Sequence, residues 1–396
     1  MTTHCGGRGG EDSGAGQSPV VLHVITDLHT GGAENMLTSL VLGSAAGRRP
    51  VAVASLMDGG GFARILERAG VTVIGLGLKP EGSGLRSPGA LFRLAGLIRR
   101  LRPDVIQSWM YHADLFAFLA WILSGRWRRT RLYWGVRCSD MDTREYRLLL
   151  RMTIRACALF SHLPTAVIAN SVAGRDAHLR LGYRPKQFPV IDNGIDPTRF
   201  AAAPETRRSV REKLGVAENL PLIALVARVD PMKDHPGFLA AFDRLQGAEA
   251  LLIGRGTESL PDRPGLHRLG QRSEVAELLA ACDIVVSGSA FGEGFSNALA
   301  EGMAAGLAPV ATDVGDARRI VGDTGVVVPP GDPGALAGAM QALIDDPERR
   351  RALGRSARRR IEEHFSLERA VEAFAAIHAG SGPDRPAPPG DDRRSA

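Results

Sequence analysis

The chain of 396 residues is poor in several features, and each shortage excludes a class of protein. It has only four cysteines, which are widely scattered and form no C-x-x-C pair: Cys5, Cys138, Cys157 and Cys282. In a chain of this length they are expected to be reduced, structural thiols of a cytoplasmic protein, not a disulfide framework. The longest apolar run, LFAFLAWIL at 115–123, is shorter than the about 20 residues that span a bilayer.

Several motifs of enzyme chemistry are also missing. There is no G-x-G-x-x-G, which counts against a dinucleotide site, and no Walker A motif. There is no G-x-S-x-G nucleophile elbow, and no metal-ligand spacing accompanies His112. The net charge of +6 could favour anionic substrates, acidic lipids or nucleic acid, and does not by itself decide between them.

The order of apolar segments predicts an α/β protein with two domains. Continuous apolar runs alternate with helical patterns, as in parallel sheets covered by helices. The alternation breaks around 192–215 and then starts again, so two Rossmann-like domains are expected at 19–195 and 196–379. Residues 1–18 are polar and glycine-rich, and residues 380–396 are proline-rich and charged; both are expected to be disordered tails.

A pair of glutamates marks the strongest candidate site. In FGEGFSNALAE, Glu293 follows a predicted strand and Glu301 lies in the second turn of a helix expected to begin at Ser296, a favourable N-cap residue. Both carboxylates are predicted to reach one crevice at the carboxyl end of the sheet, beside free helix N–H groups. The alternative is a surface glutamate and one favoured by the helix dipole. We prefer a functional role, because the small residues of this helix indicate burial and a buried carboxylate needs a partner.

Weaker signals lie in three other loops. Arg228 closes a strand in VARVDPMKDH and Lys233 precedes a helix, so the two cations suit a diphosphate, although solvated loop charges are the alternative. Gly31 and Gly32 follow the first strand and permit close approach of a ligand. His112 follows the strand DVIQSW, but a lone histidine is more often a satisfied core residue.

Arginines cluster in the first domain, and the simplest interpretation is a solvated helix face. The alternative is a basic surface resting on anionic lipid headgroups. The residues concerned are Arg86, Arg93, Arg99, Arg100 and Arg102 along one helix, then Arg126, Arg128, Arg129 and Arg131.

Together these features resemble the retaining glycosyltransferases of family four, which have the GT-B fold. The resemblance covers about 20–379 and rests on VLHVITDLHTGGAENML, VIANSVAGRDAHLRLGY, VIDNGIDPTRF, ARVDPMKDH, FGEGFSNALAEGMAAGLAPVATDVGD and TGVVVPPGDP. It implies two Rossmann-like domains facing each other across a central cleft. It also implies a hinge close to 193–196 and a last helix, at about 361–379, that returns to the first domain.

The resemblance further implies roles for the candidate residues. Arg228 and Lys233 would hold the donor diphosphate and help the leaving group depart. Glu301 would bind the ribose hydroxyls, and Glu293 would lie beside the transferred sugar. Backbone groups of four residues would contact sugar hydroxyls or phosphate: Gly294, Phe295, Ser296 and Asn297.

In the first domain, Gly32 would lie near the phosphates and His112 near the reactive face of the sugar. The chain departs from the family pattern at Asp316, which follows Gly315 where a second glycine is common, and in the loop EGFSN, where many relatives have proline or glycine after the phenylalanine. These departures leave the donor sugar open.

The expected function is therefore retaining transfer of a sugar from a nucleotide-sugar to a hydroxyl of a glycan or lipid-linked acceptor. It would need no cofactor and no essential metal, and would serve synthesis of a bacterial surface polysaccharide or glycolipid. The expected location is the cytoplasm, at the inner face of the membrane, with no nucleic acid partner. The alternatives are an epimerase or phosphorylase on the same fold, or a basic binding protein, for which aromatic residues among the arginines give little support.

Overall fold

The computed structural model describes residues 20–29, 31–46, 51–78, 88–138, 148–201 and 203–380. The two predicted tails therefore lie outside the described residues, apart from Gly380 at the start of the second, and so do Cys5 and Arg86.

The first half of the molecule is built on a parallel sheet of six strands in the order β3-β2-β1-β4-β5-β6. Every residue of β1 and β4 is buried, as expected for strands covered on both faces. The strands are β1 Val21–Ile25, β2 Val51–Ser55, β3 Thr72–Gly75, β4 Val105–Trp109, β5 Arg131–Val136 and β6 Ala166–Ala169.

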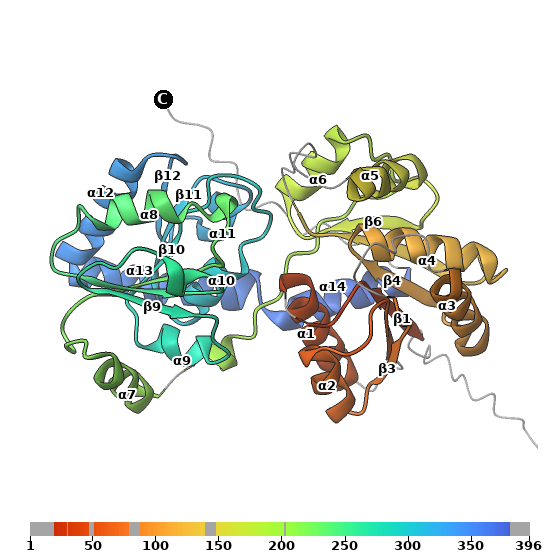
Figure 1. The fold of residues 1–396 in the computed structure, drawn as a ribbon, viewed down its shortest axis with the longest axis horizontal. Coiled ribbons are helices and arrows are strands. Elements are labelled where there is room, and N and C mark those ends of the chain that lie inside the picture. Colours follow the sequence, from red (N-terminus) through yellow and green to blue (C-terminus); the bar gives the residue numbers. More distant parts are fainter. Residues whose placement is uncertain are drawn as a thin grey trace, which may run out of the picture.

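Helices cover both faces of this sheet (Figure 1). Helices α3 (Pro88–Leu101), α4 (Tyr111–Leu123) and α5 (Leu148–Phe160) share one core with the sheet. Helices α1 (Gly32–Ala46) and α2 (Gly61–Arg68) form the core on the other face. Helix α6 (Val172–Arg180) follows the last strand.

The second half repeats the plan with a six-stranded parallel sheet in the order β12-β11-β10-β7-β8-β9. Its strands are β7 Leu222–Val226, β8 Glu249–Ile253, β9 Leu266–Gly270, β10 Ile284–Ser287, β11 Ala308–Thr312 and β12 Val326–Val328. Its helices are η2 Pro197–Phe200, α7 Pro204–Leu214, η3 Pro231–Lys233, α8 His235–Phe242, η4 Thr257–Ser259, α9 Val275–Ala280, α10 Asn297–Ala304, α11 Ala317–Val321, α12 Pro333–Asp345 and α13 Pro347–His364.

Both sheets have the same doubly wound order, with the first strand of each series next to the fourth. This is the Rossmann arrangement, and its ligands bind where the strand order reverses, outside the carboxyl ends of the strands. The prediction of two Rossmann-like α/β halves is confirmed. The reversal points lie between β1 and β4 in the first half and between β7 and β10 in the second.

The chain crosses between the halves twice, and the two crossings lie side by side. The N–H of Ile195 donates to the carbonyl of Phe365 at 2.9 Å, and the N–H of Leu367 donates to the carbonyl of Ile195 at 2.8 Å. Helix α14 (Leu367–Ala379) then packs on α1 of the first half, as Figure 1 shows.

The structure divides the single helix expected at 361–379. Helix α13 ends at His364, and Ile361 belongs to the core of the second half. Helix α14 starts anew because Ser366 caps it, accepting the N–H of Arg369 at 3.4 Å. Only α14 lies on the first half.

Candidate functional site

The predicted site residues follow the strands that flank the two reversal points. The loops after β1, β4, β7 and β10 therefore form the candidate site. Gly32 follows β1, His112 follows β4, Arg228 and Lys233 follow β7, and Glu293 follows β10.

Lys233 and Glu293 form an ion pair in the second half. The Lys233 Nζ lies 2.7 Å from each carboxylate oxygen of Glu293. Glu293 is buried, with 7% of its surface exposed. Lys233 is placed by η3, whose N-cap Asp230 accepts the N–H of Met232 at 3.0 Å. A buried carboxylate and a positioned ammonium group therefore lie at the mouth of the second sheet.

Arg228 is more exposed and binds Asp230. Its Nε and Nη2 lie 3.1 and 3.0 Å from Asp230 Oδ2. Burial alone would raise the pKa of Asp230, but the N–H of Met232 and the guanidinium of Arg228 lower it below its ordinary value. Both cations predicted to hold a diphosphate are therefore ion-paired within the protein.

The start of α10 lies directly after Glu293. Ser296 occupies the N-cap position as predicted, but its side chain makes no capping hydrogen bond. The first-turn N–H groups are thus not capped by Ser296 and remain suited to a ligand oxygen. The side chain of Phe295 packs in the core, with its ring centroid 5.5 Å from that of Phe365, so only its backbone can serve a ligand.

Glu301 lies in the second turn of α10 and is half-buried. Burial raises the pKa of its carboxyl group to about 7, and the positive charge of Arg199 opposes this shift. Within the described part of the chain, no hydrogen bond or ion pair of this carboxylate is seen. The oxygens of this carboxylate are therefore able to accept hydrogen bonds from a ligand.

The two halves touch at the candidate site. The amide of Asn193 donates to Asn297 Oδ1 at 2.7 Å. A Cβ at Gly32 would lie 3.2 Å from Asn297 Nδ2, and a Cβ at Gly294 would lie 3.0 Å from Ser171 Oγ. Both glycines therefore permit a close approach between the halves.

His112 is the second residue of α4 and is half-buried. Burial lowers its pKa, so the imidazole is neutral at pH 7. No contact between His112 and the other predicted residues is seen in the described structure. Among the described residues its imidazole makes no hydrogen bond, and both interpretations of His112, a ligand contact and a core histidine, stay predictions.

Sequence reasoning placed the hinge close to 193–196 but missed which side chains make contact across the two halves. Asn193 and Ser171 lay in segments used for the resemblance, but each meets a partner more than a hundred positions away, as in the Asn193–Asn297 separation of 104 residues. Cys138 was also missed. The pKa of its thiol is raised to about 11, first by burial and then by the charge of Glu293, while Arg228 lowers it, so the thiol lies within the electrostatic reach of both residues.

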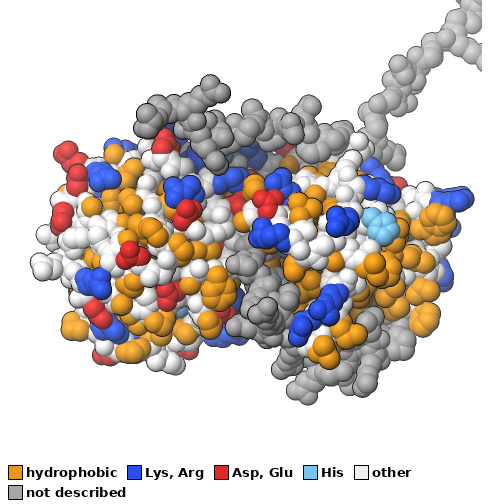
Figure 2. All heavy atoms as spheres, turned by 90° about the horizontal axis from the view of Figure 1, so that it is seen from above, with side chains coloured by type: hydrophobic (Ala, Val, Ile, Leu, Met, Phe, Trp, Pro, Cys, Tyr) orange, Lys and Arg blue, Asp and Glu red, His pale blue; other side chains and the backbone are white. Residues whose placement is uncertain are grey.

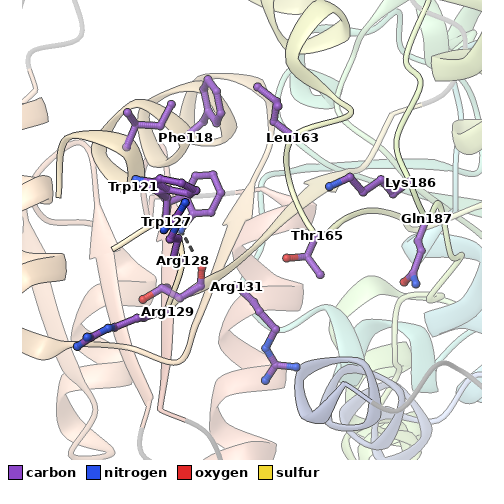
Figure 3. A pocket seen from close by; sticks show the side chains of 12 residues that line it. Phe118, Trp121, Trp127, Arg128, Arg129, Arg131, Leu163, Thr165, Lys186 and Gln187 are labelled. Carbon is purple, nitrogen blue, oxygen red and sulfur yellow. Dashed lines mark hydrogen bonds between the residues drawn. The ribbon is translucent and has the colours of Figure 1, made fainter. Parts of the chain in front are cut away.

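A separate hollow of about 960 Å³ lies at the amino ends of β5 and β6, away from the candidate site. Figure 3 shows Trp121, Trp127 and Arg128 gathered on one side of it, with Lys186 on another. Across the described residues, no group of three or more histidine, cysteine, aspartate or glutamate side chains is suited to hold a metal ion. None of the described helices has the length and apolar character needed to cross a membrane.

Comparison with known families identifies the class. Residues 30–199 match the model of Glycosyltransferase Family 4, and residues 220–346 match the model of Glycosyl transferases group 1. The fold and these matches define a glycosyltransferase of the GT-B type. Within that class, the chain belongs to glycosyltransferase family 4, as its motifs predicted.

Curated relatives align over part of their length. An alpha-maltose-1-phosphate synthase of Mycolicibacterium smegmatis is 31% identical over 54% of this chain and 62% of its own. A GDP-mannose-dependent monoacylated alpha-(1-6)-phosphatidylinositol monomannoside mannosyltransferase of Corynebacterium glutamicum is 29% identical over 46% and 53%. The chain therefore spans between half and two thirds of the length of these relatives.

Solved structures support the fold. HepE of Anabaena, crystallised with UDP-glucose, has a TM-score of 0.79 at 22% identity and covers 91% of this chain and 100% of its own. A sucrose-phosphate synthase of Thermosynechococcus elongatus has a TM-score of 0.75 at 18% identity, covering 91% and 98%.

Proposed function

We propose that the protein is a retaining glycosyltransferase that moves a sugar from a nucleotide-sugar to a hydroxyl of a glycan or lipid-linked acceptor. One observation carries the proposal: the Lys233–Glu293 pair lies beside the uncapped start of α10, and Gly32 of the other half lies against Asn297 there. The family to which the chain belongs, and the nucleotide-sugar donors named for its relatives, support the assignment.

The diphosphate of the donor would bind between Arg228 and Lys233. The described contacts use two of the five N–H donors of Arg228 and two of the three of Lys233, so donors remain for phosphate oxygens. The carboxylates already hold both side chains in place, so a phosphate would meet oriented cations. Arg228 suits bidentate binding, and Lys233 acts as a point charge.

The sugar and the ribose would bind along α10. We propose that the carboxylate of Glu301 accepts hydrogen bonds from the ribose hydroxyls, which would supply the partner it lacks among the described residues. Glu293 would lie beside the transferred sugar. The backbone groups of 294–297 would bind sugar hydroxyls or phosphate, and neutral His112 would contact the sugar from the first half.

The reaction would proceed by attack on the face of the leaving group. The bond from the anomeric carbon to the diphosphate oxygen breaks, and the new bond to the acceptor oxygen forms on the same face, through an oxocarbenium-like state. The departing phosphate takes the acceptor's proton, so no protein base is needed. Arg228, Lys233 and the start of α10 would stabilise the negative charge that develops on the diphosphate, and we therefore propose that no metal is essential.

The direct test is acceptor-dependent release of nucleoside diphosphate. UDP-glucose and GDP-mannose are the first donors to try, with mono- and disaccharides and lipid-linked sugars as acceptors, each in EDTA and again with Mg²⁺. Transfer that continues in EDTA and yields a product with the donor's anomeric configuration by NMR supports the proposal. Conversion of the donor sugar without an acceptor would instead indicate an epimerase, and an absolute need for metal would contradict metal-independence.

A peripheral contact with an anionic membrane also belongs to the proposal, at the inner face of the cytoplasmic membrane. The arginine helix predicted for this role supports it little, because Arg93 donates to the Leu76 carbonyl and Arg99 to the carbonyls of Leu123 and Ser124. A better candidate is the surface formed by α5 and the end of α4. Its exposed apolar residues are Ile122, Leu123, Trp127, Leu148, Leu149, Met152, Leu159 and Leu163.

This α4–α5 surface also carries Arg128, Arg129 and Lys186 around its hollow. Figure 2 shows orange apolar side chains beside blue basic ones over the first half, at the right. Apolar and basic side chains together suit the interface of an anionic bilayer. Flotation with vesicles containing phosphatidylglycerol should carry the protein, and the double variant Leu148→Asp/Met152→Asp should stay behind. Equal flotation of the variant would exclude this surface.

A further inference from the structure

A carboxylate of the second half binds a helix of the first half. Asp316 occupies the N-cap position of α11, but its side chain makes no capping bond to that helix. Instead Oδ2 accepts the N–H of Val172 and Oδ1 accepts the N–H of Ala173, each at 2.9 Å. These two residues begin α6. Asp316 therefore caps a helix that belongs to the other half of the molecule.

The environment makes these two hydrogen bonds strong. Asp316 is 4% exposed, so water competes little for its oxygens. A carboxylate at a helix N-terminus is favoured by the helix dipole, and charge-assisted hydrogen bonds are stronger than neutral ones. The next N–H of α6, from Gly174, donates to Ser171 Oγ at 2.9 Å, so Asp316 completes the cap that Ser171 begins.

Arg319 links Asp316 to another carboxylate, that of Asp192, which belongs to the first half. Its Nε donates to Asp316 Oδ2 at 2.8 Å, its Nη1 donates to Asp192 Oδ2 at 3.0 Å, and its Nη2 donates to Asp192 Oδ1. The guanidinium thus compensates the buried charge on both sides of the contact between the halves. We call Asp192, Asp316 and Arg319 the interdomain network.

The same loop packs on the candidate site. The N–H of Asp316 donates to the Gly294 carbonyl at 3.1 Å. Gly315 has a φ of 62°, and a Cβ there would lie 2.0 Å from the Glu293 carbonyl oxygen, so only glycine fits. Asp316 therefore contacts both α6 and the segment of Glu293 and Gly294. A shift of α6 relative to the second half would displace that segment through Asp316.

We propose that Asp316 is a positioning residue, which holds the first half against the second and thereby fixes the segment of Glu293 and Gly294 for transfer. Asp316 contacts the backbone of that segment and not the reacting groups themselves. A second glycine is common at this position in the family pattern, and glycine would have no carboxylate to cap α6. The kinetic consequence of this inference rests on the proposed function, whereas the contact between the halves does not.

The test compares Asp316→Ala with Asp313→Ala. Asp313 is a matched control, because it lies in the same loop and pairs with Arg318 at 2.7 Å, entirely within the second half. For Asp316→Ala we expect kcat to fall about a hundredfold, since small misplacements at a distance from the reacting atoms have effects of that size. Its dissociation constant for the nucleoside diphosphate should stay within about twofold, because those contacts belong to the second half. Asp316→Asn, which keeps one acceptor oxygen, should be intermediate.

Small-angle X-ray scattering supplies a readout that does not depend on activity. Asp316→Ala should have a larger radius of gyration than the unaltered protein, and Asp313→Ala should not. Equal radii would overturn the coupling of the halves, whatever the enzyme transfers. A larger radius of Asp316→Ala with kcat unchanged would overturn the positioning role.

Loss of nucleotide affinity in Asp316→Ala as large as the loss of kcat would also overturn the positioning role, because Asp316 would then support the nucleotide site itself. Absence of transfer by the unaltered protein with every donor would count against the proposed function, and the scattering result would still stand.

Discussion

The two halves share one strand order but hold their polar side chains in different ways. In the second half, the charged residues at the reversal point form ion pairs: Arg228 pairs with Asp230 in a more exposed position, and Lys233 pairs with the buried Glu293. In the first half, the polar groups beneath the reversal point lie in the core, where Trp109 Nε1 donates to His23 Nδ1 at 3.0 Å. The same topology thus supports a set of ion pairs in one half and a fixed hydrogen-bond network in the other.

This difference teaches how one fold can serve two ligands. Cations that are already oriented by carboxylates can bind an anionic ligand with their remaining N–H donors, so the second half suits the diphosphate of a donor. Buried neutral hydrogen bonds cost free energy when broken, so the first half suits a rigid surface against which the donor and acceptor are aligned. Changes to the ion pairs at the reversal point of the second half should therefore affect ligand binding and transfer. Changes to the buried hydrogen bonds beneath the reversal point of the first half should affect stability.

The largest effect is expected from Lys233→Ala. The substitution removes a cation proposed to stabilise the leaving diphosphate and leaves the buried carboxylate of Glu293 without its ion pair. We expect kcat to fall roughly 10²- to 10³-fold, the usual effect of losing one such group. Initial rates at saturating donor measure it. The control is Arg263→Ala, which breaks the exposed Arg263–Asp243 pair of the same half; an equal loss there would show that any loss of charge has this effect.

The counterpart in the first half is Trp109→Phe. It removes the donor to His23 and replaces the indole, on which the Arg137 guanidinium lies at 4.1 Å, by the smaller ring of phenylalanine. The free energy of unfolding should fall by roughly 2–4 kcal/mol, from the lost volume and the unpaired imidazole nitrogen. Urea denaturation measures this, and nucleotide affinity should be unchanged. Trp127→Phe is the matched control, since Trp127 is 49% exposed, and should change stability little.

Glu301 makes the second half sensitive to pH. Burial raises its pKa from 4.5 to about 7, so the unfolded chain loses its proton first as pH rises. The contribution of Glu301 therefore lowers the free energy of unfolding progressively as pH rises from about 4.5 to about 7, and this loss is complete above about pH 8. Glu301→Gln should accordingly raise the melting temperature more at about pH 8 than at about pH 5. A constant difference across this range would contradict the burial of a titrating carboxylate.

Nucleotide affinity should increase with pH, whereas stability decreases, because the ribose hydroxyls would donate hydrogen bonds to the ionised carboxylate of Glu301. The affinity of the unaltered protein should increase as pH rises through about 7. Glu301→Gln should bind roughly tenfold more weakly above that pH, from the loss of a charged acceptor, and should lose the pH dependence. Calorimetric titration with UDP and GDP measures both.

The alternation of apolar runs with helical patterns predicted the two series of strands. A run such as LIALV in β7 (Leu222–Val226) is apolar throughout, whereas LHRLG in β9 (Leu266–Gly270) is not. The sequence also predicted which loops carry the candidate residues, since the carboxyl ends of parallel strands share one edge. It could not predict that Lys233 binds Glu293, because a linear pattern does not show which charges meet across a separation of 60 residues.

The contacts between the halves were hidden for the same reason. Asp316 was noted only as a departure from a glycine pattern, and its partner Val172 lies 144 positions away in the chain. The break between α13 and α14 was missed because residues 361–379 have an unbroken helical pattern, whereas the two parts are buried against different halves. The boundary is marked locally by the Ser366 cap, but which half each part is buried against depends on elements far away in the chain.

The smallest effect is expected from removing a helix cap, and one cap in each half can be compared. Ser171 caps α6 and lies against Gly294, whereas Asp332 caps α12, accepting the N–H of Ala335 at 2.9 Å away from the candidate site. Replacing either by alanine should lower the free energy of unfolding by about 1 kcal/mol, the usual effect of a lost cap. Only Ser171→Ala should also lower kcat, because only that cap touches the second half at the segment proposed to bind the sugar. If both variants transfer sugar at the rate of the unaltered protein, the contact between the halves at Ser171 contributes to stability alone. Alignment of the two halves for transfer would then depend on the interdomain network and not on the Ser171 cap.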